Sequence, residues 1–293
     1  MTTPVVTFNE LVSPLGEAEF RSILQCRQLT FSRGRDPHRY ASLLNWELLI
    51  QLIERGDHPR GIDEFRLARE SVSVPAARWL ARNNVDGSIK VDKVKLDEFM
   101  NQGFSLVVDH IDRHVPQLAS LCSDIKRESG ERSYAAVVVS TGTGGAFRLH
   151  YDPEDLIIVQ AEGTKRWRIF GPPVLKPVIG GPKATPPPEE SPILDEVLQP
   201  GDFLFVPAGN WHHCQNGPGR SVHLGIFFVA PTSFDFMREM TSKLVAEDMF
   251  RMPLSRFGDP TQLSEYEHEV KRRLIDRVNR MSLRDFVSSW NAN

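Results

Sequence analysis

The sequence predicts an α+β protein in which a central series of short antiparallel strands lies between two helical regions. Two observations favour this fold class. From residue 131 to 231, short β-branched and apolar stretches alternate with Gly- and Pro-rich turns, as in an antiparallel sandwich or barrel. Before and after this region, apolar residues recur at three- and four-residue spacing, which is typical of helices that bury one face. The expected parts are an N-terminal helical region (1–130), the β core (131–231) and a C-terminal helical region (232–293).

The composition is that of a globular protein, with 40% hydrophobic and 25% charged residues among 293. A net charge of −3 gives no reason to expect a nucleic-acid-binding or membrane-binding surface. No apolar run approaches the roughly 20 residues of a membrane span, and the first residues lack the pattern of a signal peptide. Three widely spaced cysteines do not suggest a disulfide framework, so we expect a cytoplasmic protein.

The N-terminal region is expected to be mostly helical. Apolar residues repeat at helical spacing in four segments, whereas Phe65–Val74 alternates like a strand and Phe104–Val108 is uniformly apolar, as in a buried strand. The predicted helices are Glu17–Leu29, Ser42–Glu54, Asp92–Asn101 and Val115–Glu128.

The β core is predicted to contain six strands. Its glycine-rich turn, Gly142–Gly145, is not expected to be a phosphate-binding loop, because no helix follows it. Pro172–Pro192 contains many prolines and is expected to be a loop. The predicted strands are Tyr134–Val139, Phe147–Tyr151, Asp155–Gln160, Lys165–Phe170, Asp202–Val206 and Ser221–Val229.

The C-terminal region is predicted to form three helices. A run of arginines between Arg272 and Arg284 is expected to be a solvated helix face, and a nucleic-acid contact is the alternative. The predicted helices are Phe234–Phe250, Leu263–Val278 and Leu283–Trp290.

Three residues of the β core have the types and spacing of metal ligands. His150 and Asp152 are two residues apart, so their side chains share one face if this segment is a strand. The segment Gly201–His212 is a strand followed by a turn with Pro and Gly, which would bring His212 towards that pair. Two histidines and one carboxylate form the facial triad of non-haem Fe(II) oxygenases. His213 is the alternative ligand, although it would point the other way on an extended segment.

These segments resemble the JmjC and ribosomal-oxygenase branch of the cupin-like 2-oxoglutarate oxygenases. His150–Arg168 is similar to the family's H-x-D motif, the strand that ends near Gln, and the Gly-x-Lys/Arg-x-Trp turn. Gly201–His212 is similar to its Gly-Asp-x-Leu-apolar-apolar-Pro-x-Gly-x-x-His pattern. The resemblance implies a double-stranded β-helix (jelly roll) and binding of Fe(II), 2-oxoglutarate and O2. It also implies hydroxylation of a substrate, coupled to conversion of 2-oxoglutarate to succinate and CO2.

The resemblance also implies how 2-oxoglutarate is held. Lys165 is at the position that grips the distal carboxylate, and an ammonium group suits a carboxylate. Ser140 and Thr141 are candidates for a second, hydroxyl partner. Relatives often have Tyr at the position of Val138, so this part of the pocket is expected to differ.

The substrate is expected to be a protein or peptide side chain. A free amino acid or small biosynthetic intermediate is the alternative, and a non-catalytic cupin-type binding protein is a third possibility that the intact triad disfavours. His223, Arg148 and Trp211 are the candidate substrate-binding residues, with packing roles as their alternatives. The C-terminal helices suggest a homodimer, as in the family. No winged-helix domain is apparent, which argues against a ribosomal-protein substrate.

Overall fold

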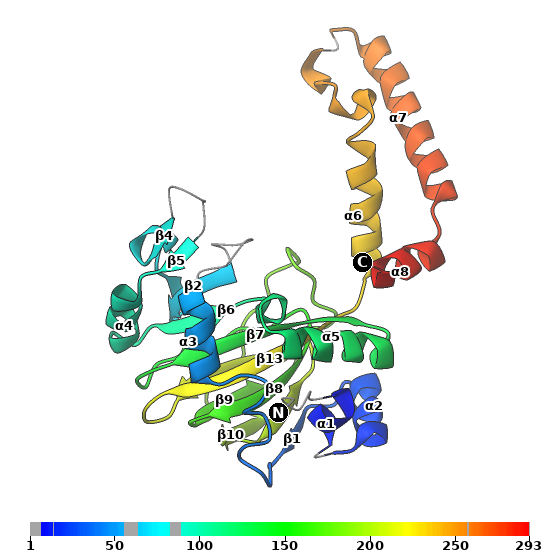
Figure 1. Ribbon diagram of the computed structural model, residues 1–293. Helices are drawn as coiled ribbons and strands as arrows, with labels where there is room; N and C mark the ends of the chain where they lie inside the picture. Colours follow the sequence, from blue (N-terminus) through cyan, green and yellow to red (C-terminus); the bar gives the residue numbers. More distant parts are fainter. Residues whose placement is uncertain (1–6, 14, 56–63, 83–88, 257, 293) are drawn as a thin grey trace. The chain divides into compact units, whose positions relative to one another are not determined.

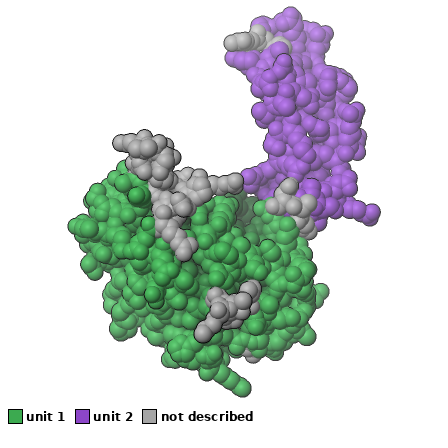
Figure 2. Space-filling model, in the orientation of Figure 1, with its two compact units in different colours: residues 1–229 green, residues 230–293 purple. Residues whose placement is uncertain are grey.

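The computed structural model describes residues 7–13, 15–55, 64–82, 89–256 and 258–292. The first residues, which lack the pattern of a signal peptide, therefore lie outside the described part. The chain divides into two compact units, Met1–Val229 and Ala230–Asn293 (Figure 2). In the described residues, no helix has both the length and the apolar character needed to span a bilayer. All three cysteines are free.

The described part of the first unit contains two antiparallel sheets and a separate hairpin, β4–β5 (Figure 1). The strand order is β1-β11-β8-β13-β7-β6-β2-β3 in the large sheet and β10-β9-β12 in the small one. This arrangement confirms the predicted α+β class with an antiparallel, jelly-roll-like core. The strands are β1 (Thr30–Ser32), β2 (Phe65–Arg69), β3 (Val72–Ser73), β4 (Leu80–Arg82), β5 (Ile89–Val91), β6 (Ser105–Val108), β7 (Arg132–Ser140), β8 (Asp155–Glu162), β9 (Lys165–Phe170), β10 (Leu194–Leu198), β11 (Phe203–Val206), β12 (Trp211–Asn216) and β13 (Ser221–Val229).

The two sheets pack face to face through alternate residues of their strands. Leu156 and Ile158 of β8 belong to the same buried cluster as Trp167 and Ile169 of β9. The intervening Ile157 belongs to the larger core on the other face of the large sheet. Because neighbouring strand residues point to opposite faces, the uniformly apolar sequence of β8 is what burial on both faces requires.

Helices cover the outer face of the large sheet. Phe20 of α2 lies with its ring 5.5 Å from that of Phe205 and 5.9 Å from that of Phe203. Both partners point away from the small sheet, so the aromatic side chains of β11 attach α2 to the core. The helices of this unit are α1 (Phe8–Val12), α2 (Glu17–Cys26), α3 (Trp46–Arg55), α4 (Lys93–Asn101) and α5 (Pro116–Ser129).

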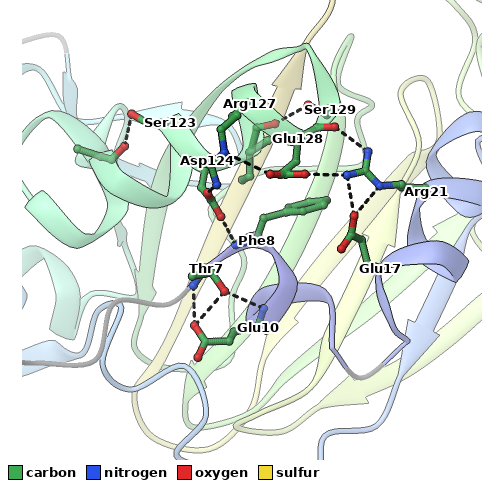
Figure 3. A network of polar contacts seen from close by, with 12 residues as sticks. Thr7, Phe8, Glu10, Glu17, Arg21, Ser123, Asp124, Arg127, Glu128 and Ser129 are labelled. Atoms are coloured by element: carbon green, nitrogen blue, oxygen red, sulfur yellow. Dashed lines mark hydrogen bonds and ion pairs between the residues drawn. The ribbon is translucent and has the colours of Figure 1, made fainter.

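A polar network joins α1 and α2 to α5 (Figure 3). The backbone N–H of Phe8 donates to Asp124 Oδ2 at 2.8 Å, which satisfies a free donor at the start of α1. Arg21 of α2 pairs with Glu17 and with Glu128 of α5. Since these ion pairs are exposed, each contributes roughly 1 kcal/mol or less, and the buried ring of Phe8 contributes more.

Several elements differ from the prediction. Helix α3 begins at Trp46 instead of Ser42, because the Asn45 side chain accepts a hydrogen bond from the N–H of Leu48 and caps the helix there. The segment 65–74 forms two strands with a turn between them. Phe147–Tyr151 is not a strand, and its only ladder pairing is a bridge between His150 and His212. Helix α1 and strands β1, β4, β5, β10 and β12 were not predicted.

In its described residues, the second unit contains three α-helices, α6 (Ser233–Leu244), α7 (Pro260–Arg280) and α8 (Leu283–Ala292). Helix α6 is shorter than predicted, and residues 248–251 form a separate 3₁₀ helix. The arginines of α7 lie beside carboxylates of the same unit; Arg272, for example, pairs with Glu269. In the described part of this unit, Leu244 and Phe286 are the only buried hydrophobic residues. Ten large hydrophobic side chains are exposed: Phe234, Met237, Val245, Met252, Leu254, Leu263, Ile275, Val278, Leu283 and Val287.

Candidate metal and co-substrate site

The structure brings the three predicted metal ligands together. His150, Asp152 and His212 each offer a ligand atom within 4.8 Å of the other two. The Nε2 atom of His212 lies 3.5 Å from Asp152 Oδ2, and the two imidazole rings are 4.2 Å apart between centroids. Two imidazoles and one carboxylate are the donor set of a facial triad, so these residues fit an Fe(II) ion.

Backbone hydrogen bonds hold this arrangement in place of the strand that we expected for Phe147–Tyr151. His150 and His212 exchange two of them, with N–O distances of 3.1 and 2.7 Å. The Asp152 carbonyl accepts a third, at 2.8 Å, from the N–H of Gly209. Gly209 has φ +85°, which favours glycine, and an added Cβ would lie 2.0 Å from the Val174 carbonyl oxygen. The turn before β12 thus fixes Asp152.

Both imidazoles are oriented for metal binding through Nε2. The Nδ1 atom of His150 lies 2.7 Å from the Arg148 carbonyl, and that of His212 lies 3.0 Å from the Asn210 carbonyl. A carbonyl only accepts, so each Nδ1 carries the proton and leaves Nε2 with a free lone pair. Burial, with a further contribution from His150, lowers the pKa of His212 to about 4. His212 is therefore neutral at pH 7, as a metal ligand must be.

His213 points to the opposite face of β12. Its Nδ1 lies 2.8 Å from Nη2 of Arg168 and 3.7 Å from a carboxylate oxygen of Glu189. The geometry therefore groups His212, and not His213, with the other two candidate ligands.

A cavity of about 530 Å³, counting the space at its mouth, adjoins the three candidate ligands. Most of its wall is apolar. Two polar side chains besides the candidate ligands, Lys165 and His223, also face it. The lining residues are Ala136, Val138, Ala146, Phe147, His150, Asp152, Leu156, Ile158, Lys165, Trp167, His212, Cys214, His223, Gly225 and Phe227.

Lys165 is a buried cation at the wall of this cavity. Its side chain is almost fully buried, with 1% of the residue surface exposed, and its Nζ donates to Ser140 Oγ at 2.8 Å. Ser140 Oγ is in turn 2.8 Å from Ser105 Oγ. Within the described part of the chain, no carboxylate pairs with Lys165. Burial lowers its pKa to about 8, so it is mostly charged at pH 7. An unpaired buried charge is costly, and an anionic ligand would offset that cost.

Strand register fixes how far Lys165 lies from the candidate ligands. In the pairing of β9 with β12, His212 is opposite Ile169 and Asn216 is opposite Lys165. Residues of the same parity on these strands face the cavity, which explains why Trp167 and Cys214 also line it. This two-residue periodicity is the signal that could have identified both from the sequence.

The other candidates take different positions. Thr141 directs its hydroxyl to the Met100 carbonyl at 2.6 Å and does not line the cavity. Arg148 is exposed, and only its backbone carbonyl touches the site. Trp211 is buried with its ring 4.9 Å from that of Tyr151. His223 faces the cavity, and its buried Nδ1 has no hydrogen-bond partner within the described structure. Val138, at which the resemblance implies a different pocket, lines the cavity.

The comparisons with known proteins agree with the resemblance. A model of the JmjC domain matches residues 108–236. The bifunctional lysine-specific demethylase and histidyl-hydroxylase NO66 of Drosophila mojavensis is 26% identical over 263 residues, covering 88% of this chain and 29% of that protein. Ribosomal oxygenase 1 of Bos taurus is 26% identical over 275 residues, covering 88% and 38% respectively. The chain thus spans less than half the length of these relatives.

The fold is shared with a solved oxygenase. The ribosomal oxygenase YcfD of Escherichia coli, solved with cobalt and 2-oxoglutarate, superimposes with a TM-score of 0.51 and 17% sequence identity. The match covers 87% of this chain and 66% of that one. Residues 108–236 are therefore similar to a JmjC domain, and the chain shares its fold with a protein named a ribosomal oxygenase.

Proposed function

We propose that this protein is an Fe(II)- and 2-oxoglutarate-dependent oxygenase that hydroxylates a protein or peptide side chain. The observation that carries the proposal is the placement of Lys165. A buried cation with no carboxylate partner in the described structure faces the same cavity as His150, Asp152 and His212. A metal-chelating dianion suits both the three candidate ligands and the unpaired lysine, because one end can bind the metal and the other can pair with the ammonium group.

Each residue then has a distinct task. His150, Asp152 and His212 hold the iron, while Lys165 pairs with the distal carboxylate of 2-oxoglutarate and Ser140 holds the Lys165 ammonium group in position. When bound, the iron and 2-oxoglutarate supply the activation of O2 for substrate hydroxylation, with release of succinate and CO2. The apolar wall, including Phe147 and Phe227, limits water around the reacting groups.

The proposed substrate is a protein side chain, because the similar curated proteins are named a histidyl-hydroxylase and a ribosomal oxygenase. The unpartnered Nδ1 of His223 is the proposed polar contact for that side chain, since it is buried and faces the cavity. A free amino acid or small biosynthetic intermediate is the second candidate. It is favoured by the mainly apolar lining of the cavity, which suits a small ligand.

We also propose that the C-terminal unit forms a homodimer. A 64-residue unit with ten exposed large hydrophobic side chains and two buried ones in its described part leaves much apolar surface without cover. Light scattering across micromolar concentrations should report twice the monomer mass. A monomer throughout would contradict this part of the proposal.

The oxygenase proposal is tested without knowing the substrate. Anaerobic addition of Fe(II) and then 2-oxoglutarate should produce the weak visible charge-transfer band of the chelate, and admission of air should yield succinate. The Asp152→Ala variant is the matched negative control, because it retains Lys165 but loses one ligand. Absence of both the band and succinate in the unmodified protein would refute the proposal. Peptides and amino acids that stimulate succinate release would then identify the substrate class.

A further inference from the structure

The candidate metal ligand His150 lies in a segment with no helix or strand of its own, between β7 and β8. Residues 141–149 contain a glycine-rich turn and a short apolar stretch, yet His150 must be held to within a fraction of an ångström to bind a metal. The β2–β3 hairpin, which lies in the N-terminal part of the chain, contacts this segment.

The tip of that hairpin has an unusual backbone. Arg69 pairs with Val72, so the loop consists of two residues, Glu70 and Ser71. Their φ angles are +50° and +63°, as a type I′ turn requires. This conformation is ordinary for Asn-Gly and costs other residues about 1 kcal/mol or more each. Such strain persists where surrounding contacts fix the backbone.

Three hydrogen bonds join the tip to the segment before His150. The N–H groups of Glu70 and Ser71 donate to the carbonyls of Gly145 and Ala146, at 3.0 and 2.9 Å. In return, the N–H of Arg148 donates to Ser71 Oγ at 3.0 Å. The segment is thereby attached to the hairpin through Gly145, Ala146 and Arg148.

The hydrogen bond between Arg148 and Ser71 connects the hairpin to His150 through the Arg148 backbone. The Arg148 backbone is held by Ser71 at its N–H, and its carbonyl accepts the Nδ1 proton of His150 at 2.7 Å. A packing path runs beside this one. Arg66 of β2 lies over the Phe147 ring at 5.4 Å, and that ring meets the His150 ring edge-on at 5.4 Å between centroids.

We infer that the β2–β3 hairpin orients His150 for metal binding, with Ser71 as a positioning residue that acts through the Arg148 backbone. This inference rests on the proposed function, because it assumes that His150 binds the metal. It goes beyond that function because it assigns an effect on metal affinity to Ser71. This residue lies 79 residues before His150, on an exposed turn outside the H-x-D motif.

The test measures metal binding instead of activity. Apo-protein is titrated with Co(II), which gives a visible d–d spectrum sensitive to ligand geometry. Ser71→Ala should weaken Co(II) binding by about tenfold and alter that spectrum. Tenfold is the lower end of the loss seen when a residue that orients a metal ligand is replaced. Ser73→Ala, which removes an exposed hydroxyl from the same hairpin, is the matched control and should bind Co(II) like the unmodified protein.

A second variant separates positioning from folding. Ser71→Gly removes the same hydroxyl but relieves the left-handed strain, so it should be at least as stable as the unmodified protein in thermal unfolding. It should nevertheless lose Co(II) affinity as Ser71→Ala does. If both Ser71 variants bind Co(II) with unchanged affinity and spectrum, the inference is wrong while the metal site stands. If the unmodified protein does not bind Co(II), the proposed function and this inference both fall.

Discussion

Replacing Lys165 with Met should make the apo-protein more stable and its binding of 2-oxoglutarate weaker. The ammonium group is buried beside Ser140 with no carboxylate partner in the described structure, and burial lowers its pKa from 10.5 to about 8. At 1.36 kcal/mol per pKa unit, this shift corresponds to an upper bound of about 3 kcal/mol of destabilisation at pH 7. Met fills a similar volume without the charge, so the free energy of unfolding should increase by about 2–3 kcal/mol.

The sign of the pH dependence follows from the lowered pKa. Below pH 8 the lysine is charged in both the folded and unfolded states, and the folded state bears the full cost of burial. Between pH 8 and about 10.5 the unfolded chain binds more protons than the folded protein, so raising the pH stabilises the fold. The advantage of Lys165→Met should therefore shrink across this range. Denaturation by guanidinium chloride at pH 7 and pH 10 measures it.

Lys165→Met should bind 2-oxoglutarate more weakly, although its fold is more stable. Loss of a hydrogen bond from a charged donor costs about 1.5–3 kcal/mol, or roughly 10- to 150-fold in affinity for 2-oxoglutarate. Calorimetric titration of the Co(II)-loaded protein measures this loss. Arg166→Met is the control, since that neighbouring cation is exposed and pairs with Asp195. A Lys165→Met protein that is less stable at pH 7 and binds 2-oxoglutarate normally would refute the reasoning.

Three further predictions concern single positions near the cavity. His212→Ala should abolish Co(II) binding, whereas His213→Ala should retain it, because only His212 lies with the other candidate ligands; the reverse result in a cobalt titration would reassign the ligand. Ser140→Ala should weaken 2-oxoglutarate binding by about fivefold, and Thr141→Val should not, since only Ser140 contacts the buried ammonium; calorimetry compares the two. Gly145→Ala should lower Co(II) affinity about tenfold, because an added Cβ would lie 2.4 Å from a backbone oxygen of β12 and displace the segment before His150; unchanged affinity would show that the segment can shift freely.

The sequence predicts the fold class well because the central strands carry their own signals. Strands β8 and β13 are buried on both faces, and their mostly apolar residues are evident in the sequence. By contrast, β12 (WHHCQN) and β10 (LDEVL) have no such signal. They are strands because β9 lies between them and supplies ladder partners on both sides, which is a tertiary effect that local propensity does not contain.

The candidate site is likewise predictable from the sequence only in part. The sequence predicts that three side chains lie close together, because their spacing matches a recognisable motif: His150, Asp152 and His212. The choice between Ser140 and Thr141 could not be predicted, because β7 ends at Ser140 and only the folded structure shows that Ser140 contacts Lys165 whereas Thr141 bonds to the Met100 carbonyl. The expected strand at Phe147–Tyr151 is wrong for a related reason. The N–H of Arg148 and the carbonyls of Gly145 and Ala146 just before this segment bond to a hairpin tip far away in sequence, and His150 pairs with His212.

The register of β9 against β12 limits how such a site can evolve. Four residues separate the position opposite Lys165 from His212, a spacing of about 14 Å along the strand. If β9 shifted by one residue against β12, the Lys165 side chain would point to solvent. A shift by two residues would change the distance between Lys165 and His212 along the strands by about 7 Å, which is more than one or two carbon–carbon bonds add to a diacid. Descendants of this chain could not adapt to a slightly shorter or longer diacid by sliding the strands. They would have to change the side chain at position 165, so the permitted lengths form a small discrete set.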